Sequence, residues 1–128
     1  MKHIIRLFLF ANLLMLASCH PHPSSTLSPQ LAQVESIMNE HPDSALRLLQ
    51  GMTPPADELN RATWALFTTQ AKYKCFVDQS DSLVNVAYDY FMKGDDTQRK
   101  ALALYLKGGL LNEKNRQDEA LPYYLQAS

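Results

Sequence analysis

The sequence predicts an all-α fold in which antiparallel helical hairpins, about three in number, stack into a short solenoid. Apolar residues recur at intervals of three and four positions, and no stretch alternates between apolar and polar residues as a half-buried strand does. Proline and glycine interrupt the helical stretches at short intervals. Similar short motifs begin at Asp43, Asp81 and Asp118, which are 38 and 37 residues apart. This interval is typical of a repeat made from two helices.

The first 18 residues predict a secretory signal peptide. Lys2 and Arg6 give residues 1–6 a positive charge without any acid, and residues 7–16 are apolar apart from Asn12. A helix that crosses a bilayer needs roughly 20 apolar residues, so this stretch is too short for a permanent anchor.

The end of the apolar stretch resembles the lipobox of bacterial lipoproteins, and the four matching residues are Leu16, Ala17, Ser18 and Cys19. The resemblance implies that residues 1–18 are removed and that Cys19, as the new N-terminus, carries acyl chains such as palmitate on its sulfur and its amine. Several acyl chains hold a protein on a membrane, whereas one alone is marginal. The alternative is an ordinary signal peptide cut nearby, in which Cys19 is incidental.

Residues 19–27 predict a tether between the lipid and the folded domain. Pro21 and Pro23 remove backbone donors, and the serines that follow contribute nothing to a core. His20 and His22 have no third ligand beside them, so we expect no metal site. No acid follows the cysteine before Glu35, which favours the periplasmic face of the bacterial envelope and leaves the choice of membrane open.

Residues 28–128 are expected to form the helical domain. Ser28 and Pro29 are suited to a helix start, and His41 ends this helix because a residue before proline avoids the α region. Pro42 begins the second helix, which ends at Gly51. After a proline break, helices are expected over about 57–75, 82–93, 97–112 and 116–128. The first of these is apolar on two sides, as is typical of a helix packed between neighbours.

Composition argues against several classes of function. Two of the 12 basic side chains lie in the signal peptide, so ten remain beside 13 acidic ones, for a net charge of −3. Nucleic-acid binding requires a basic surface, so we expect no nucleic-acid partner.

Acidic pairs at 57–58 and 95–96 lie at helix starts without a histidine beside them, where they act as caps. We therefore expect no enzyme and no cofactor, and we expect Cys75 to be an ordinary apolar residue near a helix end.

The third hairpin resembles the tetratricopeptide repeat (TPR), whose small and aromatic packing positions correspond here to Gly108, Ala120, Tyr124 and Ala127. Glycine and alanine allow the two helices of a TPR to approach closely, and the aromatic residue fills the space toward the next hairpin. Three positions differ from the TPR pattern, namely Leu104, Lys107 and Leu111. The second hairpin matches weakly, with an inter-helix loop about three residues too long. The first hairpin keeps only Asp43, Ala45 and Leu49.

The TPR resemblance implies a groove lined by the first helix of each hairpin, which binds a peptide or a helix of another protein. In the third hairpin the corresponding positions are Leu102, Tyr105, Gly109, Asn112 and Glu113. The lysine and asparagine with which some TPRs bind a C-terminal carboxylate are replaced here by tyrosine and glycine. The alternative is that Leu102 and Tyr105 simply pack against the preceding hairpin.

The complete pattern resembles bacterial TPR lipoproteins. It implies a membrane-anchored, non-catalytic protein–protein interaction module in the cell envelope, with an unidentified protein or peptide partner. The alternative is the envelope-side input part of a longer signalling or transcription-regulatory protein. We expect the repeat domain to be incomplete at its C-terminal end, because a solenoid requires a polar helix over its last apolar face. The oligomeric state is not predicted.

Overall fold

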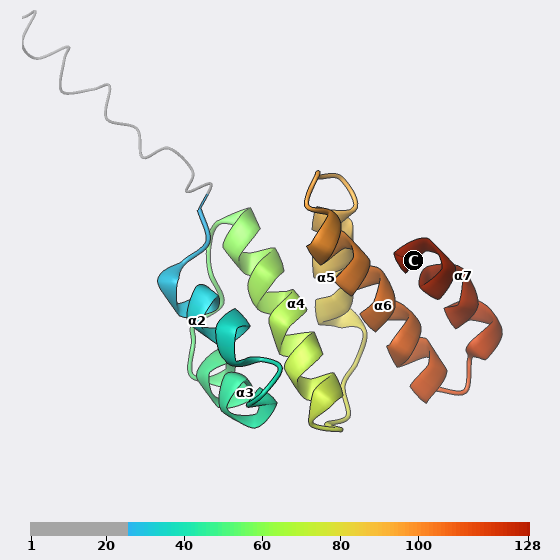
Figure 1. Ribbon diagram of the computed structural model, residues 1–128, viewed down its shortest axis with the longest axis horizontal. Helices are drawn as coiled ribbons and strands as arrows, with labels where there is room; N and C mark the ends of the chain where they lie inside the picture. Colours follow the sequence, from blue (N-terminus) through green and yellow to red (C-terminus); the bar gives the residue numbers. More distant parts are fainter. Residues whose placement is uncertain (1–25) are drawn as a thin grey trace, which may run out of the picture.

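The computed structural model describes residues 26–128, so the lipobox and residues 19–25 of the tether lie outside the described part. Within the described residues the chain forms six helices and no strand, which confirms the all-α prediction (Figure 1). The helices are α2 (Pro29–Ile37), α3 (Pro42–Gln50), α4 (Glu58–Lys74), α5 (Ser82–Phe91), α6 (Thr97–Glu113) and α7 (Gln117–Ala127). None of them is long and apolar enough to cross a membrane.

The helices pack in chain order, with α4 at the centre. Each helix contacts the next one along the chain, and α4 also contacts α2 and α6. The first helix of each successive pair therefore lies beside the first helix of the next pair, and Figure 1 shows α6 and α7 at the end of the row away from α2. This arrangement places α2, α4 and α6 in one layer.

Three helix starts are capped by side chains that the sequence places there. Ser28 Oγ accepts a hydrogen bond from the Leu31 amide, and carboxylate oxygens of Asp57 and Asp96 accept bonds from the Asn60 and Arg99 amides. These bonds satisfy amides that have no partner inside the helix. The backbone hydrogen bond from Asn60 holds the pKa of Asp57 below its usual value. The capping role predicted for the two acidic pairs is thus confirmed for Asp57 and Asp96.

Helix α2 ends at Ile37, one turn before the predicted His41. The Met38 amide donates to the carbonyl of Glu35, three residues back. This shorter hydrogen bond replaces the four-residue bond of an α-helix, so the helix ends here. His41 then occupies the cap position of α3, where its side chain makes no capping hydrogen bond.

Helix α4 is buried on several sides, as its two apolar faces predict. Its small residues Ala62, Ala65 and Ala71 are nearly inaccessible, so neighbouring helices approach its backbone closely. Thr63 and Thr69 are also buried, and each hydroxyl donates to the carbonyl four residues earlier at 2.7 and 2.8 Å. These bonds satisfy two polar groups that would otherwise be costly to bury.

The buried amide of Asn60 holds the start of the domain against α4. Asn60 Oδ1 accepts from the Ser28 amide at 2.8 Å, and Nδ2 donates to the Thr26 carbonyl at 3.1 Å and to Asp57 at 2.8 Å. Leu27 packs against the core between these two contacts. The last two residues assigned to the tether by sequence are therefore held against the folded domain.

Helices α4 and α6 end in the same type of turn. Phe76 and Asn115 have φ angles of 56° and 59°, and the residue after each donates its amide to a carbonyl five residues back, at 2.9 Å in both cases. This bond is typical of a Schellman ending, in which glycine is the usual left-handed residue. Asparagine tolerates this conformation, but a bulky aromatic residue is strained in it.

Replacing Phe76 by glycine should stabilise the fold. The side chain is 93% exposed, so little packing is lost, while the left-handed strain of about 1 kcal/mol is relieved. Urea unfolding of Phe76→Gly should show a higher midpoint with an unchanged slope. Phe76→Ala is the matched control, since it removes the ring but keeps Cβ. A midpoint that rises equally in both variants would assign the effect to the exposed ring instead of the backbone.

Candidate functional site

A groove crosses the layer formed by α2, α4 and α6. It encloses about 200 Å³ and is lined by Glu35, Met38, Asn39, Phe67, Gln70, Gln98, Arg99 and Leu102. Met38 and Phe67 form an apolar floor, and Leu102 lies partly exposed against the same core. Three amide side chains and one ion pair surround this floor. Each of the three successive pairs of helices contributes to the groove through its first helix or the turn after it.

Arg99 is the most highly connected polar residue of this groove. Its Nη1 donates to Asp96 at 2.7 Å, and its Nη2 donates to Glu35 of α2 at 2.8 Å. The guanidinium carbon lies 5.9 Å from the centre of the Phe67 ring, within the range of a cation–π contact. One side chain of α6 thus reaches across α4 to α2 and covers the apolar floor.

The electrostatics of this cluster favour its charged forms. Partial burial alone would raise the pKa of Asp96, but hydrogen bonds and charge from Arg99 outweigh it, so the pKa of this carboxyl lies below its usual value. Burial alone would lower the pKa of Arg99, but hydrogen bonds and charge from Asp96 and Glu35 outweigh this effect and raise it. Asp96 and Arg99 are therefore both ionised at neutral pH.

The groove residues predicted from the TPR resemblance occupy different places. Leu102 lies in the groove, whereas Asn112 and Glu113 are exposed at the far end of α6 and do not line it. Gly109 is buried, and a Cβ atom there would lie 2.9 Å from the Tyr73 ring. The expectation that Gly109 lines the groove is therefore wrong, because Tyr73 of α4 packs directly on its backbone.

Tyr105 belongs to an aromatic cluster next to the groove. It is 47% exposed. The centre of its ring lies 6.1 Å from that of Tyr73, in an edge-to-face arrangement, and 5.8 Å from that of Tyr124. Burial raises the pKa of Tyr73 to about 12, with further contributions from Tyr105, Tyr124 and the carboxylate of Glu113. Tyr105 therefore both packs against the preceding hairpin and remains partly accessible.

The predicted small and aromatic packing positions meet between α6 and α7. A Cβ atom on Gly108 would lie 2.9 Å from Tyr124 Cε1 and 3.2 Å from the Ala120 carbonyl oxygen. Ala120 is buried, and Ala127 is half-buried in the last turn of α7. Pro122 lies inside α7. It has no amide hydrogen, so the carbonyl of Asp118 receives no helical bond from it.

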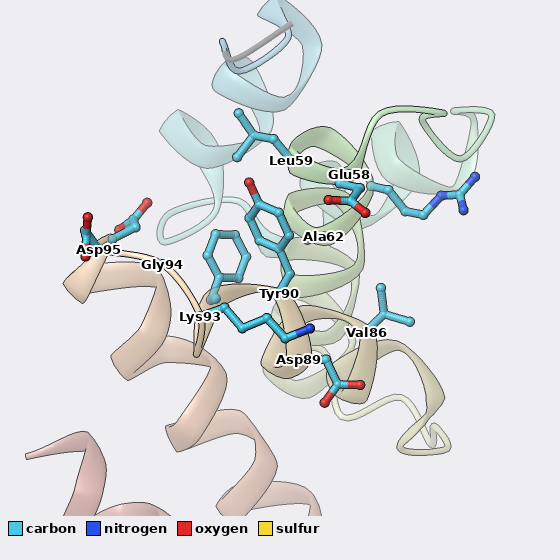
Figure 2. Close-up of a pocket in the computed structure, with 12 residues that line it drawn as sticks. Glu58, Leu59, Ala62, Val86, Asp89, Tyr90, Lys93, Gly94 and Asp95 are labelled. Atoms are coloured by element: carbon cyan, nitrogen blue, oxygen red, sulfur yellow. The ribbon is translucent and has the colours of Figure 1, made fainter. Parts of the chain in front are cut away.

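A second hollow of about 680 Å³ lies between the start of α4, the end of α5 and the loop before α6 (Figure 2). Figure 2 shows the Tyr90 ring directed toward Leu59, with Asp95 and Gly94 on one side and Asp89 and Lys93 below. Its lining combines apolar side chains with four carboxylates and two basic side chains. Val86 of α5 also lines this hollow and is 41% exposed.

The described part of the chain holds no group of three histidine, cysteine, aspartate or glutamate side chains placed to bind a metal ion. Cys75 is half-buried at the end of α4 and packs against the core. Neither Arg99 nor Glu35 was identified from sequence. The interval between Asp96 and Arg99 suggests a local pair, but no local pattern relates two residues 64 positions apart.

No protein-family model, curated protein or solved structure matches this chain.

The contact between α6 and α7 predicts the effect of filling the space at Gly108. Gly108→Leu should lower stability by about 1–3 kcal/mol, because the new side chain collides with Tyr124 and the α7 backbone. Thermal unfolding followed by circular dichroism measures this loss. Gly94→Leu is the matched control, since no atom lies within 4 Å of a Cβ there. If both variants melt like the parent chain, the register of α6 against α7 is wrong.

Proposed function

We propose that this chain is a membrane-anchored, TPR-like module for protein–protein interaction in the bacterial cell envelope. The observation that carries the proposal is the groove across α2, α4 and α6, in which an apolar floor is bordered by amide side chains. Apolar surface supplies affinity for a partner, and amides pair with its backbone or polar side chains. No single helix pair provides this combination, because the lining comes from three.

Two structural features support a TPR-like solenoid. The first is the repeated turn, in which the left-handed residues Phe76 and Asn115 occur 39 positions apart with the same backbone hydrogen bond after each. The second is the contact between Gly108 and Tyr124, a small residue against an aromatic one. Repeated local geometry of this kind is expected when successive hairpins are built on one plan.

The lipid anchor rests on the lipobox at residues 16–19 and the proline-containing segment after it. The contacts of Asn60 with residues 26 and 28 fix the place at which the chain from Cys19 enters the domain. A module held in this way stays near the membrane, and its groove is presented to partners in the same compartment.

A photo-reactive amino acid in the groove tests the interaction function. At Gln98, which is exposed at the groove, we expect a discrete cross-linked product in intact cells. Lys114, exposed at the other end of α6, is the matched control and should give none. Gln70→Trp, which fills the groove, should reduce the product several-fold while circular dichroism shows a folded domain. Equal products from positions 98 and 114 would contradict the proposed groove.

Substitution of Cys19 tests the anchor. Cys19→Ala should leave the protein in the soluble fraction after lysis and abolish incorporation of labelled palmitate, because the acyl chains have no attachment site. Cys75→Ala is the matched control and should remain with the membranes. Mass spectrometry must show whether residues 1–18 have been removed. A processed Cys19→Ala protein that still sediments with membranes would refute the lipoprotein assignment.

A further inference from the structure

The guanidinium of Arg99 is held in position by its own helix. Asp96 caps α6 with one carboxylate oxygen, which accepts from the Arg99 amide at 3.1 Å, and binds Nη1 of Arg99 with the other at 2.7 Å. The Phe67 ring supports the group from below. A cation fixed in this way loses little rotational freedom when another group binds it.

The bond between Arg99 and Glu35 is of a different kind. Glu35 comes from α2, 64 residues away, and its side chain is 48% exposed. In the described part of the chain its carboxylate accepts no other side-chain hydrogen bond. Solvent around the half-exposed Glu35 carboxylate screens this ion pair and weakens it. The Glu35 carboxylate is therefore easily displaced, whereas the Asp96 carboxylate is not.

Arg99 also has an unused donor. Its Nε is buried and donates to no partner among the described residues, while the neighbouring Nη2 is bonded to Glu35. Arginine binds carboxylates most strongly when two nitrogens of the guanidinium donate in parallel to the two oxygens. Glu35 does not achieve this geometry, and a buried donor without a partner is costly. A carboxylate that is free of the α2 backbone can engage Nη2 in place of Glu35, and it engages Nε as well once the groups that cover this nitrogen move aside.

We propose that Arg99 anchors a carboxylate of the partner, and that Glu35 occupies the same position in the free protein as an internal competitor. The inference rests on the proposed function of the groove. The amides of Asn39, Gln70 and Gln98 lie around this position and are suited to the polar backbone of the partner segment. The expected ligand is thus a peptide segment that presents an acidic group with an apolar residue beside it for the groove floor.

The test uses the full-length chain in detergent micelles and three short peptides with blocked N-termini. The first has two glutamates flanking a leucine and an amidated C-terminus. The second replaces both glutamates by glutamine. The third is the glutamine peptide with a free C-terminal carboxylate, so that the source of the carboxylate can be distinguished. Binding is followed by NMR through the Nε–Hε signal of Arg99 and the backbone amides of α6.

We expect the glutamate peptide to shift the Arg99 signal and to bind Glu35→Gln about fivefold more tightly than the parent chain, since the competitor is gone. Arg99→Lys keeps the charge but not the paired donors, and should lose the preference for the glutamate peptide over the glutamine peptide. Asp43→Asn is the matched control, because it removes an acid from another exposed ion pair, with Arg47, outside the groove. Its affinity should equal that of the parent chain.

Each other outcome has a definite meaning. If the glutamate and glutamine peptides bind equally at the groove, Arg99 is not the anchor, although the groove still binds peptides. If Glu35→Gln binds no more tightly than the parent chain, Glu35 is not a competitor. If no peptide shifts any groove signal, even in Glu35→Gln, the anchor proposal fails, and cross-linking from position 98 then decides separately whether the groove has a partner. A preference for the third peptide over the first would assign the site to a chain terminus.

Discussion

The burial of α4 is the constraint on which the rest of the structure depends. This helix contacts α2, α3, α5 and α6, so its surface must accept neighbours in several directions. Alanines allow close approach, and the buried Thr63 and Thr69 remain acceptable because their hydroxyls bond to the helix itself. The first and third helix pairs are held in one body because both pack on this helix. The groove and the second hollow both lie along its length.

Local signals allowed most helix bounds to be predicted from the sequence. Serine and aspartate caps, and proline at the first helical positions, act within three or four residues and leave clear patterns. The end of α2 was predicted one turn too late. The hydrogen bond from the Met38 amide to the Glu35 carbonyl, three residues back, ends the helix before Pro42 is reached. At Pro122 the opposite occurs, since α7 continues through a residue type that usually ends a helix.

The acidic motifs on which the predicted repeat rests do not occupy equivalent places in their helices. The acidic motifs are 38 and 37 residues apart, yet Asp43 and Asp118 lie inside the first turn of their helices, whereas Asp81 occupies the cap position. The connection between α4 and α5 is longer than that between α6 and α7, and Gln79 fixes it by donating to the Thr69 carbonyl at 3.1 Å. The turns after α4 and α6 are therefore more alike than the positions of the three acidic motifs.

The candidate site was predicted only in part, because its central contacts join residues far apart in the chain. The TPR resemblance placed both Leu102 and Gly109 in the groove, and Leu102 does line it, but Gly109 is covered by Tyr73. The pair between Glu35 and Arg99 links the first and third helix pairs across α4. Since this bond joins the two outer helices of the layer, displacing Glu35 would release one link between α2 and α6. Binding and the relative position of these two helices would then be coupled, because one guanidinium takes part in both.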